Sequence, residues 1–166
     1  DRNIDRNQIQ RFATCDFITQ KDNILITGST GAGKSYMASA IGHQACSLGF
    51  KTMYFNTSKL FTMLKTSKAD GSYLKQVNKI EKQDLLILDD FGLKGLDNIN
   101  RHSLMEIIED RHGKKSTIIA SQLPVETWHE IIGEQTIADA ILNRLVHTAH
   151  RIDIKGESMR KKLKNK

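Results

Sequence analysis

The chain has 166 residues, of which 39% are hydrophobic and 27% charged, and its net charge is +6. A chain of this length is expected to form one domain and to bury a core that needs no disulfide or structural metal. The absence of a long apolar run, and two cysteines without a pairing or metal-ligand spacing, exclude a membrane-spanning or disulfide-built protein and favour a cytoplasmic one.

Short apolar strands alternate with helical patterns along the chain. Residues 1–22 form a polar lead-in segment in which we expect a helix, residues 23–154 the body of the domain, and residues 155–166 a basic tail. The predicted strands cover residues 23–27, 52–56, 85–88, 116–120 and 149–154. The predicted helices run from 34 to 48, from 57 or 58 to 70, from 72 past 80, from 97 to 112, around 126–132 and around 136–146. This alternation predicts an α/β fold with a parallel sheet, and ligands in such sheets bind at the carboxyl ends of the strands.

A glycine-rich loop joins the first predicted strand to its helix. The segment GSTGAGKS matches the pattern GxxxxGK[ST], and it consists of Gly28, Ser29, Thr30, Gly31, Ala32, Gly33, Lys34 and Ser35. Glycines allow a tight turn whose N–H groups meet phosphate oxygens, and the helix start adds a positive dipole end. In such a loop, Lys34 reaches the β- and γ-phosphates and the Ser35 hydroxyl binds Mg²⁺. The loop therefore predicts a site for ATP and Mg²⁺.

Two carboxylates end the third predicted strand, which reads LLILDD. We expect Asp89 to hold Mg²⁺ from a strand next to that of the loop, and Asp90 to orient or deprotonate the attacking water. The fourth strand leads to Ser121 and Gln122. Gln122 has the longer side chain and is the better candidate for bonding the γ-phosphate or the water, although a turn or helix cap explains either residue equally well.

Two arginines lie on or beside apolar helical stripes. Arg111 continues the face of Leu104 and Ile107, and Arg144 lies at the margin of the stripe through Ile141. Such a position suits a subunit interface, where an arginine can complete a neighbour's site. We favour Arg144 for this role and keep Arg111 as the alternative, although snorkelling or a helix C-terminal charge explains both positions.

The basic charge is concentrated in two blocks. Residues 51–82 and 151–166 each carry +5, which leaves −4 for the remainder. This asymmetry predicts a polyanionic partner, most simply nucleic acid bound without base-specific contacts, and a solvated surface is the alternative. The candidate DNA-binding side chains are Lys59, Lys65, Lys68, Lys75, Lys79 and Lys82.

These segments together resemble the IstB-like ATP-binding proteins, which are helpers of insertion-sequence transposition related to the DnaC and DnaI helicase loaders. The matching stretches include NILITGSTGAGKS, DLLILDDFG, IIEDRHGKKSTIIASQLPVETWHE, AILNRL and AHRIDIKGESMRKK. The resemblance implies an AAA+ P-loop fold, a three-layer α/β/α arrangement with a five-stranded parallel sheet. It implies that the loop is Walker A and that Asp89 and Asp90 form Walker B. It also implies that Gln122 lies at sensor 1, Arg144 at the box VII arginine finger and Arg160 at sensor 2.

The resemblance further implies partners. Segment 57–82 corresponds to the helical insertion of the initiator clade, which contacts DNA, and family members form ATP-dependent homo-oligomers on double-stranded DNA and act on a transposase. Asp-Asp in place of the common Asp-Glu, and Gln122 in place of asparagine, depart from the pattern and suggest slow turnover. Our hypothesis is a DNA-stimulated ATPase that regulates a transposase. The alternatives are a replicative helicase loader, a nucleotide-gated DNA-binding module with little hydrolysis and, least favoured, a small-molecule kinase.

Overall fold

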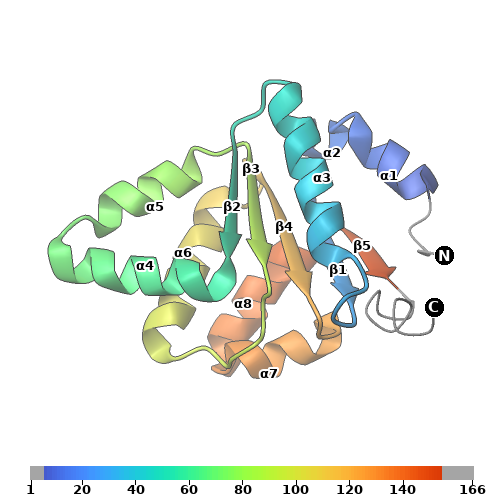
Figure 1. Cartoon of the computed structure of the whole chain (residues 1–166). Coiled ribbons are helices and arrows are strands. Elements are labelled where there is room, and N and C mark those ends of the chain that lie inside the picture. The colour runs from blue at the N-terminus through green and yellow to red at the C-terminus, as the bar shows by residue number, and fades with distance from the viewer. Residues whose placement is uncertain (1–5, 155–166) are drawn as a thin grey trace.

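The computed structural model describes residues 6–154 (Figure 1). The strands are β1 Asn23–Gly28, β2 Thr52–Asn56, β3 Leu85–Asp89, β4 Ser116–Ser121 and β5 Ala149–Ile154. The helices before β3 are α1 Arg6–Ala13, α2 Asp16–Thr19, α3 Lys34–Ser47, α4 Thr57–Asp70 and α5 Tyr73–Glu81. Those after it are α6 Asn98–Arg111, a 3₁₀ turn at Val125–Thr127, α7 Trp128–Ile132 and α8 Gln135–Val146. The predicted alternation of strands and helices is thereby confirmed.

The five strands form one parallel sheet in the order β2-β3-β4-β1-β5. The expectation that the Asp89 strand lies next to the loop strand was wrong, because β4 lies between β1 and β3. Apolar strands buried on both faces carry no periodic signal for their order. The order nevertheless brings the end of β4 beside the end of β1, and the end of β3 lies one strand further along the same edge.

The sheet has a separate hydrophobic core on each face. Neighbouring residues of one strand alternate between them, so that Ile24 and Ile26 pack towards α1, α2 and α3, whereas Leu25 packs towards α6, α7 and α8. Trp128 is fully buried in the second core, where its ring meets Phe91 edge to face. The arrangement is a three-layer α/β/α sandwich in which α4 and α5 form an arm beside β2 (Figure 1).

Polar caps set the starts of three helices. Asn56 accepts the N–H of Lys59 at the start of α4, Asp97 accepts that of Asn100 at the start of α6, and Glu134 caps α8. Gly71 ends α4 in a left-handed conformation. These contacts explain why the helix starting at Asp97 and the break at Gly71 were predictable.

The lead-in segment differs from the single helix that we expected. It contains α1 and α2, separated at Cys15, which is buried and left-handed with φ 56°. Among residues 6–154, no helix combines the length and the apolarity that crossing a bilayer requires.

Candidate functional site

The loop from Gly28 to Gly33 leaves the carboxyl edge of the sheet and turns into α3. A Cβ atom on Gly28 would lie 2.7 Å from the backbone oxygen of Ile154 in β5, so only glycine fits where the loop begins. Gly33 is the residue before α3 and has φ 101°, a left-handed conformation that side chains disfavour. The chain can therefore turn sharply and point the first N–H groups of α3 into the loop.

Lys34 is the first residue of α3 and folds back across the loop. Its side chain is largely buried, and its Nζ donates to the backbone oxygen of Ser29 at 2.9 Å. Burial lowers the pKa of Lys34, while the negative charges of Asp89 and Asp90 act in the opposite sense. The ammonium group thus lies in the loop, and both carboxylates act on it electrostatically although β4 separates their strands.

Asp89 is buried at the tip of β3, with 2% of its surface exposed. Its Oδ2 accepts a hydrogen bond from the Tyr54 hydroxyl, and its Oδ1 accepts the N–H of Asp90 at 2.9 Å. The Thr57 hydroxyl donates to the backbone oxygen of Asp89 at 2.6 Å. Side chains from β2 and α4 therefore fix both the backbone and the carboxylate of Asp89.

Asp90 follows Asp89 in a left-handed conformation with φ 56°. Its Oδ2 accepts a hydrogen bond from the Asn56 amide at 3.1 Å. Asn56 stands opposite Asp89 in the register of β2 and β3, which places its amide beside the turn. Unlike Asp89, Asp90 is only partly buried, so it can face a substrate water.

Gln122 follows β4 and contacts the loop directly. The Thr30 hydroxyl donates to Gln122 Oε1 at 2.7 Å. Ser121, the other candidate here, is buried and donates to the backbone oxygen of Phe91 at 2.6 Å, so it supports the turn after Asp90. The structure thus brings Gln122 to the phosphate loop and gives Ser121 a structural contact.

A cleft of about 470 Å³ lies beside the loop on the β5 side. Its lining includes Gly28, Ser29, Gln122, Arg151 and Asp153. The cleft provides room for a ligand against the loop.

The two arginine candidates lie in different environments. Arg111 is 2% exposed, and its guanidinium donates to the backbone oxygens of Ile80 at 2.9 Å, Gln83 at 2.7 Å and Ser116 at 2.6 Å. Burial lowers the pKa of Arg111 to about 10, although the negative charges of Asp84 and Glu81 act to raise it. The guanidinium therefore remains charged at neutral pH. Arg111 is committed to its own core, and the alternative that it reaches into a neighbouring subunit was wrong.

Arg144 lies on α8, one residue before Leu145. The Asn23 amide donates to the Leu145 backbone oxygen, and Asn23 begins β1, so Arg144 lies towards the amino edge and away from its own loop. Its guanidinium donates to the Ala140 backbone oxygen and to Glu109 Oε1 at 3.0 Å. The side chain remains about one-third exposed. Arg160, the predicted sensor 2 residue, lies outside the described residues.

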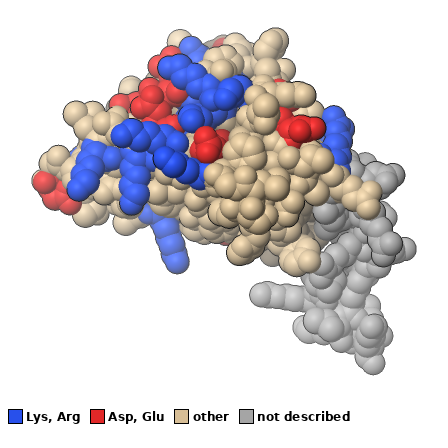
Figure 2. Space-filling view, turned by 90° about the horizontal axis from the view of Figure 1, so that it is seen from above, with Lys and Arg blue, Asp and Glu red and all other residues tan. Residues whose placement is uncertain are grey.

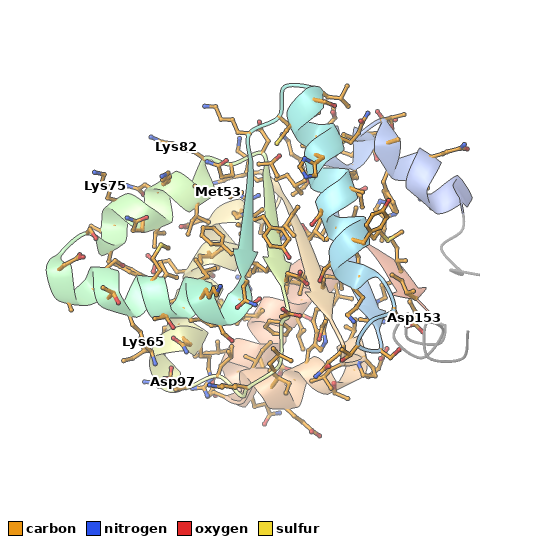
Figure 3. All side chains as sticks on the ribbon, in the orientation of Figure 1. Met53, Lys65, Lys75, Lys82, Asp97 and Asp153 are labelled. Atoms are coloured by element: carbon orange, nitrogen blue, oxygen red, sulfur yellow. The ribbon has the colours of Figure 1, made fainter. Side chains whose placement is uncertain are left out.

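The six candidate lysines lie on α4, on α5 and at the end of α5. Basic side chains gather on that side of the molecule in Figure 2, and Lys75 and Lys82 project from α5 in Figure 3. Lys65 pairs with Asp97, and Lys68 Nζ lies 4.7 Å from the centre of the Tyr73 ring. Two of the lysines thus have partners within the chain, and the exposed others are Lys59, Lys75, Lys79 and Lys82.

The oxygen atoms at the loop suit Mg²⁺. The Ser35 hydroxyl in the first turn of α3 and the Asp89 carboxylate at the tip of β3 are hard oxygen ligands. A hydroxyl and a carboxylate from two elements at the same edge of the sheet form a donor set that fits Mg²⁺.

Sequence reasoning missed Tyr54, Asn56 and Thr57. All three lie at or near the end of β2, and a signal was available, because polar residues at the tip of a parallel strand meet those of the neighbouring strand. Residue type alone gives no such indication for Tyr54 in a half-buried strand, or for Thr57, which is the first residue of α4.

The fold and the loop define a P-loop protein of the AAA+ class. Solved structures agree: the DnaI structure superposes with a TM-score of 0.80 at 24% identity over 93% of this chain and 88% of that one. The DnaC helicase loader gives 0.76 at 23% identity over 92% of each chain.

The sequence matches the family of IstB-like ATP binding proteins over residues 1–166, and the chain belongs to that family. It is 48% identical to the insertion sequence ATP-binding protein y4pL of Sinorhizobium fredii over its whole length and 68% of that relative. It is 42% identical to y4uH of the same organism, over 96% of this chain and 64% of that one. The chain thus spans about two-thirds of the length of these relatives.

Proposed function

We propose that this chain binds ATP with Mg²⁺ at the carboxyl edge of its sheet, hydrolyses the ATP slowly, and serves DNA transposition in the cytoplasm as a helper ATPase. The observation that carries this proposal is the convergence of Lys34, Asp89 and Asp90 on the loop Gly28–Ser35. The printed names of the relatives, insertion sequence ATP-binding proteins, support the link to transposition.

Each site residue has a distinct role in this proposal. Loop N–H groups and Lys34 bind the phosphates, while Ser35 and Asp89 would hold Mg²⁺, which supplies positive charge at the γ-phosphate when bound. Asp90 orients the attacking water or accepts its proton, and Gln122, held at the loop by Thr30, bonds the γ-phosphate or that water. Arg160 is proposed as a further nucleotide contact from the basic tail.

Arg144 is proposed to act on the site of a neighbouring subunit. Its position towards the amino edge keeps it away from its own loop, and its exposed pair with Glu109 contributes only about 0–1 kcal/mol. A neighbour's γ-phosphate can therefore replace Glu109 as the partner. This role requires a homo-oligomer with ATP between subunits.

Non-specific double-stranded DNA is the proposed polyanionic partner of α4 and α5. The arm extends away from the sheet, and its exposed lysines can follow a phosphate backbone without contacting base edges. Lys59, Lys75, Lys79 and Lys82 are the strongest candidates, because Lys65 and Lys68 must first leave Asp97 and Tyr73. The protein partner is proposed to be a transposase, and a replicative helicase remains the alternative.

A nucleotide-gated DNA-binding module with little hydrolysis is a second candidate. The observation that favours it is the hydrogen bond from Asn56 to Asp90, which holds the proposed base on the β2 side of the site. Aspartate is also one methylene shorter than glutamate, so it reaches less far towards a water.

Phosphate release from ATP, measured with and without duplex DNA, tests the proposal. We expect Mg²⁺-dependent release that DNA accelerates, and DNA affinity that falls steeply with salt. Tight ATP binding without release, even with DNA, would favour the gated module. Failure to bind ATP would reject both. Capture of purified transposase, with a replicative hexameric helicase as the competitor, would then decide between the protein partners.

A further inference from the structure

Tyr54 occupies an unusual place for an exposed aromatic residue. It lies on β2, and 47% of its surface is exposed, yet its hydroxyl reaches over the carboxyl end of β3 and donates to Asp89. Met53 and Phe55 pack into the core on the other face, so the alternation of the strand directs Tyr54 towards the α3 side. The ring also lines a shallow groove together with Ser39 and His43 of α3.

The Tyr54 hydroxyl joins two neighbouring strands at the proposed metal site. It donates to Asp89 Oδ2 from β2, whereas Asp89 ends β3. A carboxylate oxygen that accepts one hydrogen bond keeps further lone-pair positions for another partner.

We infer that Tyr54 is a positioning residue for the proposed magnesium site, holding the Asp89 carboxylate so that Asp89 presents its remaining oxygen lone pairs to the ion. The inference rests on the proposed function. Outer-shell hydrogen bonds of this kind orient metal ligands, and their loss typically weakens metal binding by about 10- to 100-fold. No Mg²⁺ contact is assigned to Tyr54 itself.

The chain offers a matched control in Tyr73. Its hydroxyl donates to Glu106 Oε2 at 2.6 Å, which is also a tyrosine–carboxylate bond, but it joins α5 to α6 outside the site. Tyr73→Phe therefore removes the same kind of contact without touching the loop. An effect of Tyr54→Phe that Tyr73→Phe does not share cannot arise from the loss of a tyrosine hydroxyl as such.

The test is a Mn²⁺ titration of the whole chain bound to a non-hydrolysable ATP analogue, followed by the spectroscopic signal of free Mn²⁺. We expect Tyr54→Phe to weaken Mn²⁺ binding by about 10- to 100-fold, and Tyr73→Phe to match the wild type. Binding of the analogue in EDTA should stay within about twofold for both variants, and this second measurement also verifies that they are folded.

The outcomes separate the inference from the proposal beneath it. If the wild type binds Mn²⁺ with the analogue and Tyr54→Phe binds it equally well, the role of Tyr54 is wrong while the nucleotide site stands. Equal weakening in Tyr54→Phe and Tyr73→Phe also overturns the inference. If the wild type binds neither the analogue nor Mn²⁺, the proposed function itself fails.

Discussion

Buried or half-buried polar groups lie at both edges of the sheet, but their partners differ between the two edges. At the amino edge, Arg111 donates to four backbone oxygens, while Asp84 accepts the Lys51 N–H and pairs with Lys115. At the carboxyl edge, Lys34, Asp89 and Asp90 lie near one another at a glycine turn.

The difference shows that burial of a charge does not by itself identify a functional site. Arg111 is more deeply buried than Lys34, and its partners are backbone oxygens of its own chain that an arginine fork fits well. Lys34 has one backbone partner and two carboxylates nearby, with a cleft beside the loop. Four predictions test whether one edge is structural and the other functional.

Arg144→Ala should have the largest effect of the four substitutions. Arg144 is an exception to the comparison, because it lies towards the amino edge and yet is proposed to have a functional role. We expect turnover in the DNA-bound assembly to fall by about 10³-fold, with ATP affinity unchanged, because an arginine acting in trans stabilises the charge of the transition state. Phosphate release and ATP titration measure the two quantities. Unchanged turnover in an assembly that still forms would remove Arg144 from the site.

Arg111→Leu should lower the free energy of unfolding by about 3–5 kcal/mol, because it leaves several buried backbone oxygens without a donor. Urea denaturation measures this loss, and the folded fraction should bind ATP normally. As a control, Arg151→Leu removes an exposed arginine that pairs with Glu126 and should cost less than about 1 kcal/mol. A loss below 1 kcal/mol in Arg111→Leu would contradict its structural role.

Lys34→Ala should show the opposite pattern. ATP affinity should fall by about 100-fold or more, since a charge-assisted contact to phosphate is worth up to about 3 kcal/mol. Stability without nucleotide should change by less than about 1 kcal/mol, because removing Lys34 also removes the burial penalty that lowers its pKa. Calorimetric titration and thermal melts measure the two effects, and Lys21→Ala, an exposed lysine, is the control. Retained micromolar affinity would contradict the assignment of the loop.

Asp84→Asn should have the smallest effect, and it should depend on pH. Burial raises the Asp84 pKa, but the Lys51 N–H and Lys115 outweigh it, so the pKa in the folded state lies below the ordinary value of 3.8. The stabilisation from Asp84 is therefore complete above pH 3.8 and is lost as the pH falls through the lower pKa of the folded state. Urea denaturation should show the stability gap between wild type and variant shrinking below pH 4. A stability difference that grows below pH 4 would contradict a lowered Asp84 pKa in the folded state.

Most of the fold was predictable because strand and helix periodicities are local. The loop Gly28–Ser35 and the tip at Asp89 were predictable for the same reason, since each is one contiguous motif. The position of β4 between β1 and β3 was not, because buried apolar strands do not encode their neighbours. Arg111 looked like an interface residue because the sequence pattern of a helix shows which face is apolar. The pattern does not show which backbone oxygens of other elements that face contacts in the folded chain.

The contacts of Tyr54 and Asn56 could not be predicted from their own strand, because their partners, Asp89 and Asp90, are more than thirty positions away. Only the pairing of β2 with β3 brings them together. The site residues that the motifs did not predict are therefore those whose contacts join elements distant in the sequence.

The most direct test is amide hydrogen exchange with and without ATP and Mg²⁺. At ATP concentrations about 100 times its Kd, amides of residues 28–35 should exchange up to about 100-fold more slowly, while those of the amino-edge turn at 112–115 should keep their rates. Protection confined to 112–115, or none at 28–35 under saturating nucleotide, would contradict the assignment of the carboxyl edge as the nucleotide site.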